Sequence, residues 1–387
     1  MTTGYDYEVM LPTKIHFGVG SLDRLGEEVQ RLLAKHACII TDPGVYKAGL
    51  VRPVKEQLSK ARISVDVFTE AEPEPTFARL NTIAAELGKE SYDLLVGVGG
   101  GSSMDMTKGV SAILSHGGKG EDYSGVNRVP GPVIPIFAIP TTSGTASEVT
   151  RVCVFRDLEK GQKIAIISPY LLPRLAAVDP ALTYSCPPKV TASSGIDALV
   201  HAIEAFTSNK ANNFSDSLAV AAMRLIWDNL RTAVKNGSDK QARERMAEGS
   251  LFAGLSFANS GLAIIHAFAH VLGARFHVPH GVANGLFLSH CLEYNILGNV
   301  EKHAAVAQIF GVKTRGLSAR EVAGRGVEAT QNLNKDIGVP LRLRDVGVPR
   351  EALTGMAAAS MEATRLLSQN PRPVFADDVK RIWENAW

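Results

Sequence analysis

One change in hydrophobic pattern, near Cys186-Pro187-Pro188, constrains the fold of this chain more than any other feature. Before it, short apolar runs alternate with segments of helical periodicity, which is typical of a doubly wound, mainly parallel sheet with helices on both faces. After it, strand patterns nearly vanish and long Ala- and Leu-rich segments follow. The prolines therefore predict a boundary between an N-terminal α/β domain, residues 1–186, and an all-helical domain, residues 187–387.

The apolar runs also predict individual elements. Strands are expected over 37–41, 63–68, 93–98 and 132–139, and a hairpin is expected over 153–167 around a turn at 156–161. In the second domain, helices are expected over 215–232, 243–272 and 320–336.

Composition excludes several classes of protein. The 387 residues carry a net charge of +2 and are 45% hydrophobic, so we expect a soluble chain with enough core for two domains and no basic surface for nucleic acid. No apolar stretch reaches the roughly 20 residues of a membrane span, and the first residues lack the pattern of a secretory leader. A cytoplasmic location is the expectation. The four cysteines lie far apart, which argues against a disulfide framework or a thiolate metal site.

Five ionisable residues of the second domain form a suggestive constellation. Asp197 and His201 stand four residues apart, as do His266 and His270, and His280 follows within Val-Pro-His-Gly. Residues at i and i+4 share one helical face, and one carboxylate with three imidazoles suits Fe²⁺ or Zn²⁺. Singly, His266 or His270 is explained as a hydrogen-bonded core residue and Asp197 as a helix cap. Their conjunction in apolar segments favours a metal site, because a bound cation would compensate their burial.

A glycine-rich segment, residues 97–108, carries a second pattern. It follows an apolar strand and opens a helix, so its backbone amides are suited to bind an anion such as a pyrophosphate. It does not match the G-x-G-x-x-G fingerprint, because Ser102 occupies the sixth position. A tight turn with Ser102 as helix N-cap and Asp105 at N3 explains it equally well. Residues 140–148 also follow a strand and offer several hydroxyls for a phosphate or ribose, or simply form a capped loop.

Several ordered motifs together resemble the iron-containing (group III) alcohol dehydrogenases, a family that includes lactaldehyde reductases and propanediol dehydrogenases. They are Gly99-Gly-Gly-Ser-x-x-Asp-x-x-Lys108, Pro140-Thr-Thr-x-Gly-Thr-x-Ser-Glu148, Gly195-x-Asp-x-x-x-His-x-x-Glu204, His266-Ala-x-Ala-His270 and Pro279-His-Gly281. The resemblance runs from Ile15 to Arg372. It implies the dehydroquinate-synthase-like architecture that this family shares.

The resemblance also implies roles for single residues. Asp197, His201, His266 and His280 would hold the metal, and His270 would lie near the nicotinamide and act in catalysis. The glycine loop would bind the pyrophosphate of a dinucleotide. The implied cofactor-binding residues are Asp42, Gly100, Gly101, Ser102, Thr141, Thr142, Thr145, Lys163 and Leu182.

Asp42 bears on the choice of cofactor. It matches the family position beside the adenosine ribose, where a carboxylate accepts from the 2′-hydroxyl and repels a 2′-phosphate, so NAD is expected rather than NADP. The alternative is a turn residue in Asp-Pro-Gly. Glu74 departs from the family, whose members usually have asparagine there, and this puts one cofactor contact in doubt.

The implied activity is NAD-dependent oxidation of a small alcohol or diol, or reduction of the aldehyde, with Fe²⁺ or another divalent metal. Apolar residues around the histidines favour a small, weakly charged substrate over the acid phosphate of a dehydroquinate-synthase-like lyase. They are Phe252, Leu255, Phe257, Leu262, Ile264, Ile265 and Phe268. A non-catalytic NAD-binding protein is the third possibility. A homodimer is expected from the family and from the prevalence of twofold symmetry.

Overall fold

A computed structural model describes residues 6–159 and 161–387. They form two compact units, one of residues 11–186 and one of residues 187–387 together with the described part of the first ten residues. This differs at the N-terminus from the expected domain 1–186, because the backbone N–H of Met10 donates to Oδ1 of Asn259 at 2.8 Å. Residues 1–5, for which no secretory leader was expected, lie outside the described residues. So does Lys160, in the turn of the predicted hairpin.

The α/β unit is built on a six-stranded sheet in which every pair of neighbouring strands is parallel, with the order β1-β9-β6-β4-β2-β3. This confirms the predicted doubly wound fold. Its elements are β1 Lys14–Phe17, α1 Leu25–Leu32, β2 His36–Ile40, α2 Pro43–Lys47, α3 Val51–Lys60, β3 Ser64–Phe68, α4 Phe77–Leu87, β4 Leu94–Gly99, α5 Gly101–His116, β5 Gly125–Val126, β6 Ile136–Pro140, β7 Val152–Asp157, β8 Gln162–Ile167 and β9 Leu175–Val178.

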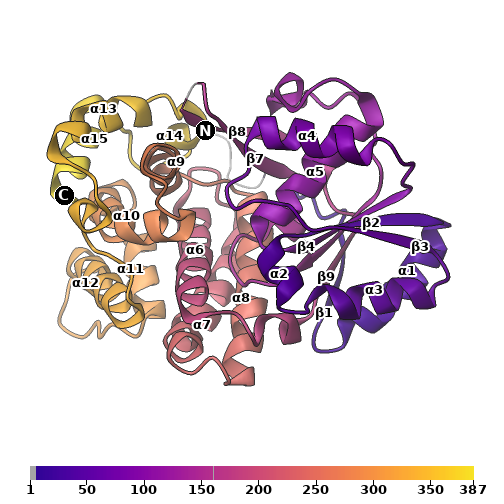
Figure 1. Cartoon of the computed structure of the whole chain (residues 1–387). Helices are drawn as coiled ribbons and strands as arrows, with labels where there is room; N and C mark the ends of the chain where they lie inside the picture. Colours follow the sequence, from indigo (N-terminus) through magenta and orange to yellow (C-terminus); the bar gives the residue numbers. More distant parts are fainter. Residues whose placement is uncertain (1–5, 160) are drawn as a thin grey trace. The chain divides into compact units, whose positions relative to one another are not determined.

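Helices cover both faces of this sheet (Figure 1). Alternate residues of β2 point to opposite faces, as the period of a strand requires. Cys38 and Ile40 pack in one core with residues of α4 and α5, whereas Ala37 and Ile39 pack in another with residues of α1 and α3. Both faces are therefore buried, which explains why the strands are nearly continuous apolar runs in the sequence.

The predicted hairpin is confirmed as β7 and β8, which pair antiparallel and form a second, three-stranded sheet with β5. The predicted strand 132–139 is shorter and begins only at Ile136. Strands β1 and β9 were not predicted. Each has four residues, too few for a periodic signal, and they are recognised by their pairing, β1 with β9 and β9 also with β6.

Residues 187–387, all of them described, form helices and connecting loops, as predicted. The helices are α6 Pro188–Thr207, α7 Asn213–Lys235, α8 Lys240–Ala258, α9 Ile264–Phe276, α10 His280–Asn295, α11 Val300–Ile309, α12 Ala319–Ile337, α13 Leu353–Ser360, α14 Thr364–Ser368 and α15 Ala376–Asn385. In the described part of the chain, none of the helices is both long and apolar enough to cross a membrane.

The single helix predicted over 243–272 is wrong, because the segment forms two helices, α8 and α9. Helix α8 ends at Ala258, and Gly261 then adopts the left-handed conformation, with a φ of +80°. Glycine adopts this conformation without the steric cost that a Cβ brings. The break gives α9 a new N-terminus within the domain, close to His266.

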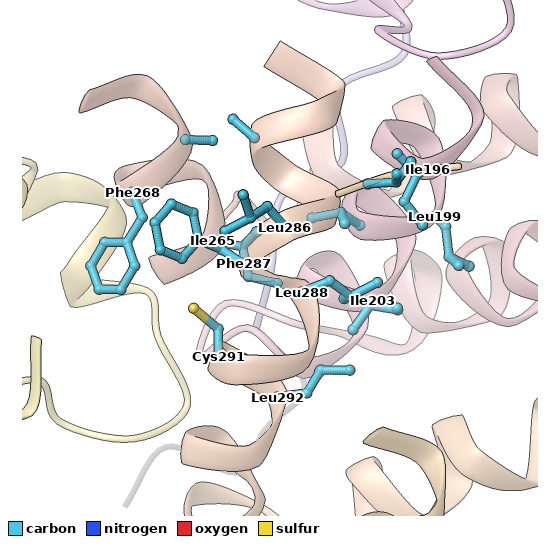
Figure 2. Packing of buried hydrophobic residues seen from close by; sticks show 14 of the residues in the cluster. Ile196, Leu199, Ile203, Ile265, Phe268, Leu286, Phe287, Leu288, Cys291 and Leu292 are labelled. Atoms are coloured by element: carbon cyan, nitrogen blue, oxygen red, sulfur yellow. The ribbon is translucent and has the colours of Figure 1, made fainter. Parts of the chain in front are cut away.

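The core of the helical unit surrounds α10. Figure 2 shows Leu286, Leu288 and neighbouring side chains of α10 between Ile196 and Leu199 of α6 on one side and Phe268 of α9 on the other. All five residues are buried, and they belong to one hydrophobic cluster. Close packing of this kind allows little rotation or sliding. It therefore fixes the three helices α6, α9 and α10 relative to one another.

Candidate metal and cofactor sites

Helix α6 presents three ionisable residues on one side. Asp197, His201 and Glu204 are separated by four and three residues, so their side chains stack along one face of the helix. All three are buried. Burial of such groups is costly unless they pair with charges or hydrogen-bond partners, so a compensating arrangement is expected around them.

The other two predicted ligands come from α9 and α10. His266 lies in the first turn of α9, and His280 is the first residue of α10. Gly281 permits the close approach of α10 to α6, since a Cβ at this position would lie 1.9 Å from the carbonyl oxygen of Ser193. Only glycine therefore fits where the ligand-bearing end of α10 meets α6.

The four predicted metal ligands converge. Nε2 of His201, His266 and His280 lies 3.7, 3.7 and 3.8 Å from the same oxygen, Oδ1 of Asp197. Ligand atoms of Asp197, His201 and His266 all lie within 4.8 Å of one another. Donor atoms bound to one Zn²⁺ or Fe²⁺ ion are each about 2 Å from it, so spacings of this order suit a shared cation.

Burial and ring packing restrict two of these side chains. The ring of His201 stacks between those of Phe257, at 4.4 Å between centroids, and His266, at 4.7 Å. Asp197 and His266 are buried, whereas the side chain of His280 is 28% exposed. A partly exposed ligand on an otherwise buried set leaves one side from which a substrate can approach.

The charges of the cluster support cation binding. Burial raises the pKa of Asp197, but His201, His280 and His266 outweigh it and hold that pKa well below its usual value. The carboxylate therefore stays ionised near neutral pH, as a ligand must. Burial lowers the pKa of His266, but Asp197 and Glu204 outweigh it and raise that pKa to about 9. A cation at Nε2 of His266 must therefore displace a proton.

Asn284, one turn after His280 on α10, also faces the ligands. Its Nδ2 lies 2.6 Å from Oδ1 of Asp197 and 3.2 Å from Nε2 of both His266 and His280. Its Oδ1 is buried and finds no hydrogen-bond partner among the described residues. Rotation of the amide by half a turn would instead bring this oxygen toward Oδ1 of Asp197 and Nε2 of His266 and His280. A carbonyl oxygen in that place can coordinate a divalent cation. The donor set therefore fits the metal that the sequence predicts.

His270 lies beside the ligands without joining them. Its ring is 5.4 Å from that of His280 and 6.4 Å from that of His266, measured between centroids, and the side chain is partly exposed. The group of three ligand atoms within 4.8 Å of one another, from Asp197, His201 and His266, contains neither His270 nor His280, but Nε2 of His280 lies 3.8 Å from Oδ1 of Asp197. The predicted difference in role between His270 and the metal ligands stays a prediction.

The predicted cofactor residues gather at the carboxyl ends of adjacent strands in the α/β unit. Asp42 follows β2, the glycine loop follows β4, and Thr141 follows β6, in the order in which the sheet places these strands. The chain continues from β2 and from β4 toward opposite edges of the sheet, so β2 and β4 flank a topological switch point. Ligands of open α/β sheets bind at such points.

Asp42 caps a helix and also faces the glycine loop. Its Oδ1 accepts from the N–H groups of Gly44 and Val45 at 2.8 and 3.0 Å, so it caps α2, as the turn interpretation predicts. Its Oδ2 faces the glycine loop and accepts from Oγ of Ser103 at 3.3 Å. The carboxylate thus has one oxygen for the fold and one beside the predicted cofactor loop.

The interpretation of Ser102 as a helix N-cap is wrong. Helix α5 begins at Gly101, its N-cap is Gly100, and no side chain caps its amides. Asp105 instead accepts from Oγ of Ser147 and the N–H of Val154, at 2.7 and 2.9 Å. The first turn of a 16-residue helix therefore keeps its amides and its positive end for an anion.

The hydroxyl-bearing loop after β6 packs against this turn. The N–H of Thr141 donates to the carbonyl of Gly99 at 3.0 Å, and a Cβ at Gly101 would lie 2.9 Å from Oγ1 of Thr145. Thr142 Oγ1 lies 3.5 Å from the equivalent point at Gly100. The structure therefore brings together the glycines and threonines that the sequence predicts to bind one dinucleotide.

Buried Lys108 anchors the same loop. Its ammonium donates to three backbone carbonyls, those of Ser147, Thr150 and Val152, at 2.7, 2.9 and 2.9 Å. It is wholly buried. Sequence reasoning noted this lysine in a motif but gave it no role.

The last two predicted cofactor residues lie elsewhere in the unit. Leu182 is buried in the core between the sheet and helices α1 and α3, and it is 5% exposed, so it offers little surface to a ligand. Lys163, on β8, pairs with Oε1 of Glu74 at 2.8 Å, and the N–H of Glu74 donates to Oγ of Ser102 at 3.1 Å. Glu74 thus links Lys163 to the glycine loop.

Comparison with known proteins places both units in one family. Residues 12–180 match the family described as iron-containing alcohol dehydrogenase, and residues 191–387 match the C-terminal region of the Fe-containing alcohol dehydrogenase family. The chain belongs to the iron-containing alcohol dehydrogenase family. The resemblance stated from the sequence motifs is confirmed, and so is the predicted architecture.

Relatives of known activity extend over nearly the whole chain. Long-chain-alcohol dehydrogenase 1 of Geobacillus thermodenitrificans is 41% identical, covering 98% of this chain and 96% of the relative. The 1,3-propanediol dehydrogenase of Klebsiella pneumoniae is 39% identical, covering 98% and 99%. The lactaldehyde reductase of Escherichia coli is 36% identical, covering 96% and 97%.

Solved structures agree with this assignment. A 1,3-propanediol oxidoreductase superposes with a TM-score of 0.95 at 39% identity, over 99% of this chain and 100% of the other. A sulfoacetaldehyde reductase of Bifidobacterium kashiwanohense, solved with NAD⁺, gives 0.86 at 29% identity, over 99% of both chains. This iron-containing alcohol dehydrogenase is therefore an oxidoreductase that uses NAD and a divalent metal, as predicted.

Proposed function

We propose that this enzyme interconverts a small, weakly charged primary alcohol or diol and its aldehyde. The observation that carries the proposal is the convergence of Asp197, His201, His266 and His280, with the side chain of His280 partly exposed. The relatives named above act on alcohols, a diol and an aldehyde. Of the apolar residues counted in favour of such a substrate, Ile264, Ile265 and Phe268 are buried in the core, whereas Phe252, Leu255, Phe257 and Leu262 stay partly exposed.

We assign the metal-ligand role to the four converging residues. Fe²⁺ is the preferred occupant from the family, and the same donors suit Zn²⁺ or another divalent ion. Such an ion supplies Lewis acidity at the substrate oxygen and so lowers the pKa of the alcohol. Asp197 contributes the negative charge that makes the site selective for cations, and the stacked rings of His201 and His266 restrict each other's movement.

In the α/β unit, we assign cofactor binding to the residues at the carboxyl ends of the strands. The unsatisfied amides at the start of α5, from Gly101 and Ser102 beside Gly100, bind the pyrophosphate, while Thr141, Thr142 and Thr145 contact it from the adjacent loop. Oδ2 of Asp42 accepts from the ribose 2′-hydroxyl and disfavours NADP. Lys163 serves the nicotinamide end. Bound NAD supplies the hydride acceptor.

We propose His270 as the group that relays the alcohol proton to solvent. It is partly exposed and lies next to His280, the most exposed ligand. An imidazole suits this work because its pKa lies near neutrality, and such groups contribute roughly 10²–10⁴-fold to rates. We also propose that the α/β unit, which ends at Cys186, binds the cofactor and that the helical unit binds the metal. We further propose a homodimer and a cytoplasmic location.

The test combines metal analysis with activity. The protein is purified without oxygen, loaded with Fe²⁺ or Zn²⁺, and assayed for NADH formation with short alcohols and diols, and with NADP in place of NAD. We expect activity with NAD and at least one alcohol. No NADH formation with any metal and alcohol, together with no NADH consumption with any aldehyde, would reject the proposal.

Two variants separate the residue roles. Asp197→Ala should lose metal and activity together. His270→Ala should keep its metal content and lose turnover by roughly 10²-fold or more. Loss of metal from His270→Ala would instead make His270 a ligand, and normal metal content in Asp197→Ala would exclude the proposed site.

A further inference from the structure

Glu204 is a buried carboxylate for which the proposed reaction has no direct use. It lies on α6, one turn beyond His201, and is 2% exposed. Three groups of the adjoining start of α9 face it. Oε2 accepts from the N–H of Ala263 at 3.0 Å and from Nδ1 of His266 at 2.7 Å, and Oε1 accepts from the N–H of Ile265 at 2.7 Å.

The contact with His266 determines which ring nitrogen carries the proton. A neutral imidazole has one N–H and one free electron pair, and the nitrogen facing a carboxylate keeps the proton. Since Glu204 faces Nδ1, the free electron pair is left on Nε2, the atom that points toward Oδ1 of Asp197. A carboxylate behind a ligating histidine also increases the basicity of the ring.

The contacts with the two amides determine where α9 begins. The N-cap residue of α9, Ala263, provides no side-chain cap. Glu204 replaces that cap from a different helix, and its negative charge opposes the positive end of α9. One carboxylate therefore ties α9, which carries His266, to α6, which carries Asp197 and His201.

We propose that Glu204 is a positioning residue of the metal centre, which selects the metal-binding tautomer of His266 and fixes the first turn of α9 against α6. This inference rests on the proposed ligand role of His266. Glu204 touches neither the cation nor the substrate. Its effect is therefore on metal affinity, and through it on activity.

The test is the affinity of Glu204→Gln for Zn²⁺, measured by competition with a chromophoric chelator. A carboxamide has one accepting oxygen, so its NH₂ group must face either Ile265 or the pair formed by Ala263 and His266. In the second orientation, the NH₂ group donates to Nδ1 and moves the ring proton to Nε2. We expect Zn²⁺ to bind roughly 10–100-fold more weakly than to the unaltered enzyme.

The matched control is Asn295→Ala in the same unit. It breaks a buried pair of side-chain hydrogen bonds with Asn370, of 2.9 and 2.7 Å, and touches no ligand. We expect it to lower the unfolding temperature and leave Zn²⁺ affinity unchanged. Unchanged affinity in a folded Glu204→Gln would overturn the inference, as would an equal loss of affinity in Asn295→Ala.

A second measurement applies even if Glu204→Gln does not fold. In the unaltered enzyme loaded with Zn²⁺ and labelled with ¹⁵N at histidine, we expect the His266 signals to show a proton on Nδ1, whereas a proton on Nε2 would overturn the inference. The variant Asp197→Ala distinguishes failure of the role proposed for Glu204 from failure of the proposed metal site. If it binds Zn²⁺ as tightly as the unaltered enzyme, the metal site itself is wrong, whereas loss in Asp197→Ala with full binding in Glu204→Gln rejects only the role of Glu204.

Discussion

At the scale of single residues, Glu148 shows how burial changes the charge of a side chain. It is 3% exposed, and its Oε2 has no hydrogen-bond partner among the described residues. Burial raises the pKa of this carboxyl to about 7, although a backbone hydrogen bond and Lys108 act in the opposite direction. The folded enzyme therefore binds a proton here at pH values at which an unfolded glutamate has lost it.

This shift predicts a pH dependence of stability. Because the folded pKa exceeds the unfolded value of 4.5, the stabilisation is complete below pH 4.5 and is lost as pH rises to about 7. We expect the free energy of unfolding to fall, relative to that of Glu148→Gln, by on the order of 3 kcal/mol over this interval. Urea unfolding of both proteins at several pH values measures the difference, and parallel curves would contradict it.

Glu74 and Lys163 form an ion pair without net charge, and the backbone N–H of Glu74 donates to Oγ of Ser102 in the glycine loop. Glu74 adopts a left-handed backbone, with a φ of 51°, which asparagine tolerates better. Replacing Glu74 by asparagine removes a negative charge and leaves the Lys163 cation, proposed to serve the nicotinamide end of the cofactor, without its ion-pair partner. We expect Glu74→Asn to lower the KM for NAD, and Lys163→Met to raise it, each by roughly three- to tenfold. Steady-state kinetics decides between this and a structural role, for which both variants would raise KM.

At the scale of elements, the contact between α10 and α6 depends on the absence of a side chain. A Cβ at Gly281 would lie 1.9 Å from a backbone oxygen of α6, and backbone moves less easily than the end of a side chain. A Cβ at Gly324, in α12, would meet nothing within 4 Å. The same substitution in two helices of one unit should therefore have opposite effects.

We expect Gly281→Ala to destabilise the protein by about 3 kcal/mol or more and to weaken Zn²⁺ binding, because α10 must shift together with His280. Gly324→Ala should stabilise it by about 0.5–1 kcal/mol through helix propensity, with Zn²⁺ binding unchanged. Chemical unfolding and chelator competition measure both effects. Equal stabilities of the two variants would show that α10 adjusts without cost.

At the scale of the whole molecule, the residues proposed to bind the cofactor and those proposed to bind the metal belong to different units. The cofactor residues lie within 11–186, and the metal ligands lie within 187–387. A ligand present at 100 times its Kd stabilises the protein that binds it by about 2.7 kcal/mol. We expect both Zn²⁺ and NAD to raise the unfolding temperature. In Asp197→Ala, Zn²⁺ should no longer raise the unfolding temperature, whereas NAD should still raise it. Differential scanning fluorimetry measures both shifts. Loss of both shifts would show that metal is needed for cofactor binding.

The sequence by itself determined the order of strands and helices over most of the chain and the residues proposed as metal ligands. Strands buried on both faces are continuous apolar runs, and ligands four residues apart share a helical face, so both signals are local. Glu204 carried the same signal, since it lies three residues after His201 on the same face, and Asn284 follows His280 by four. Neither had a predicted role, because their partners were unknown.

Only the tertiary structure decided what these local patterns meet. The break between α8 and α9 follows from Gly261, and it places two amides and His266 around a carboxylate about sixty residues earlier. The short strands β1 and β9 exist because they pair across the chain. The packing of α6, α9 and α10 decides whether three imidazoles lie near Asp197. This packing depends on many contacts between residues that are far apart in the sequence, so the spacing of residues in the sequence does not reveal it.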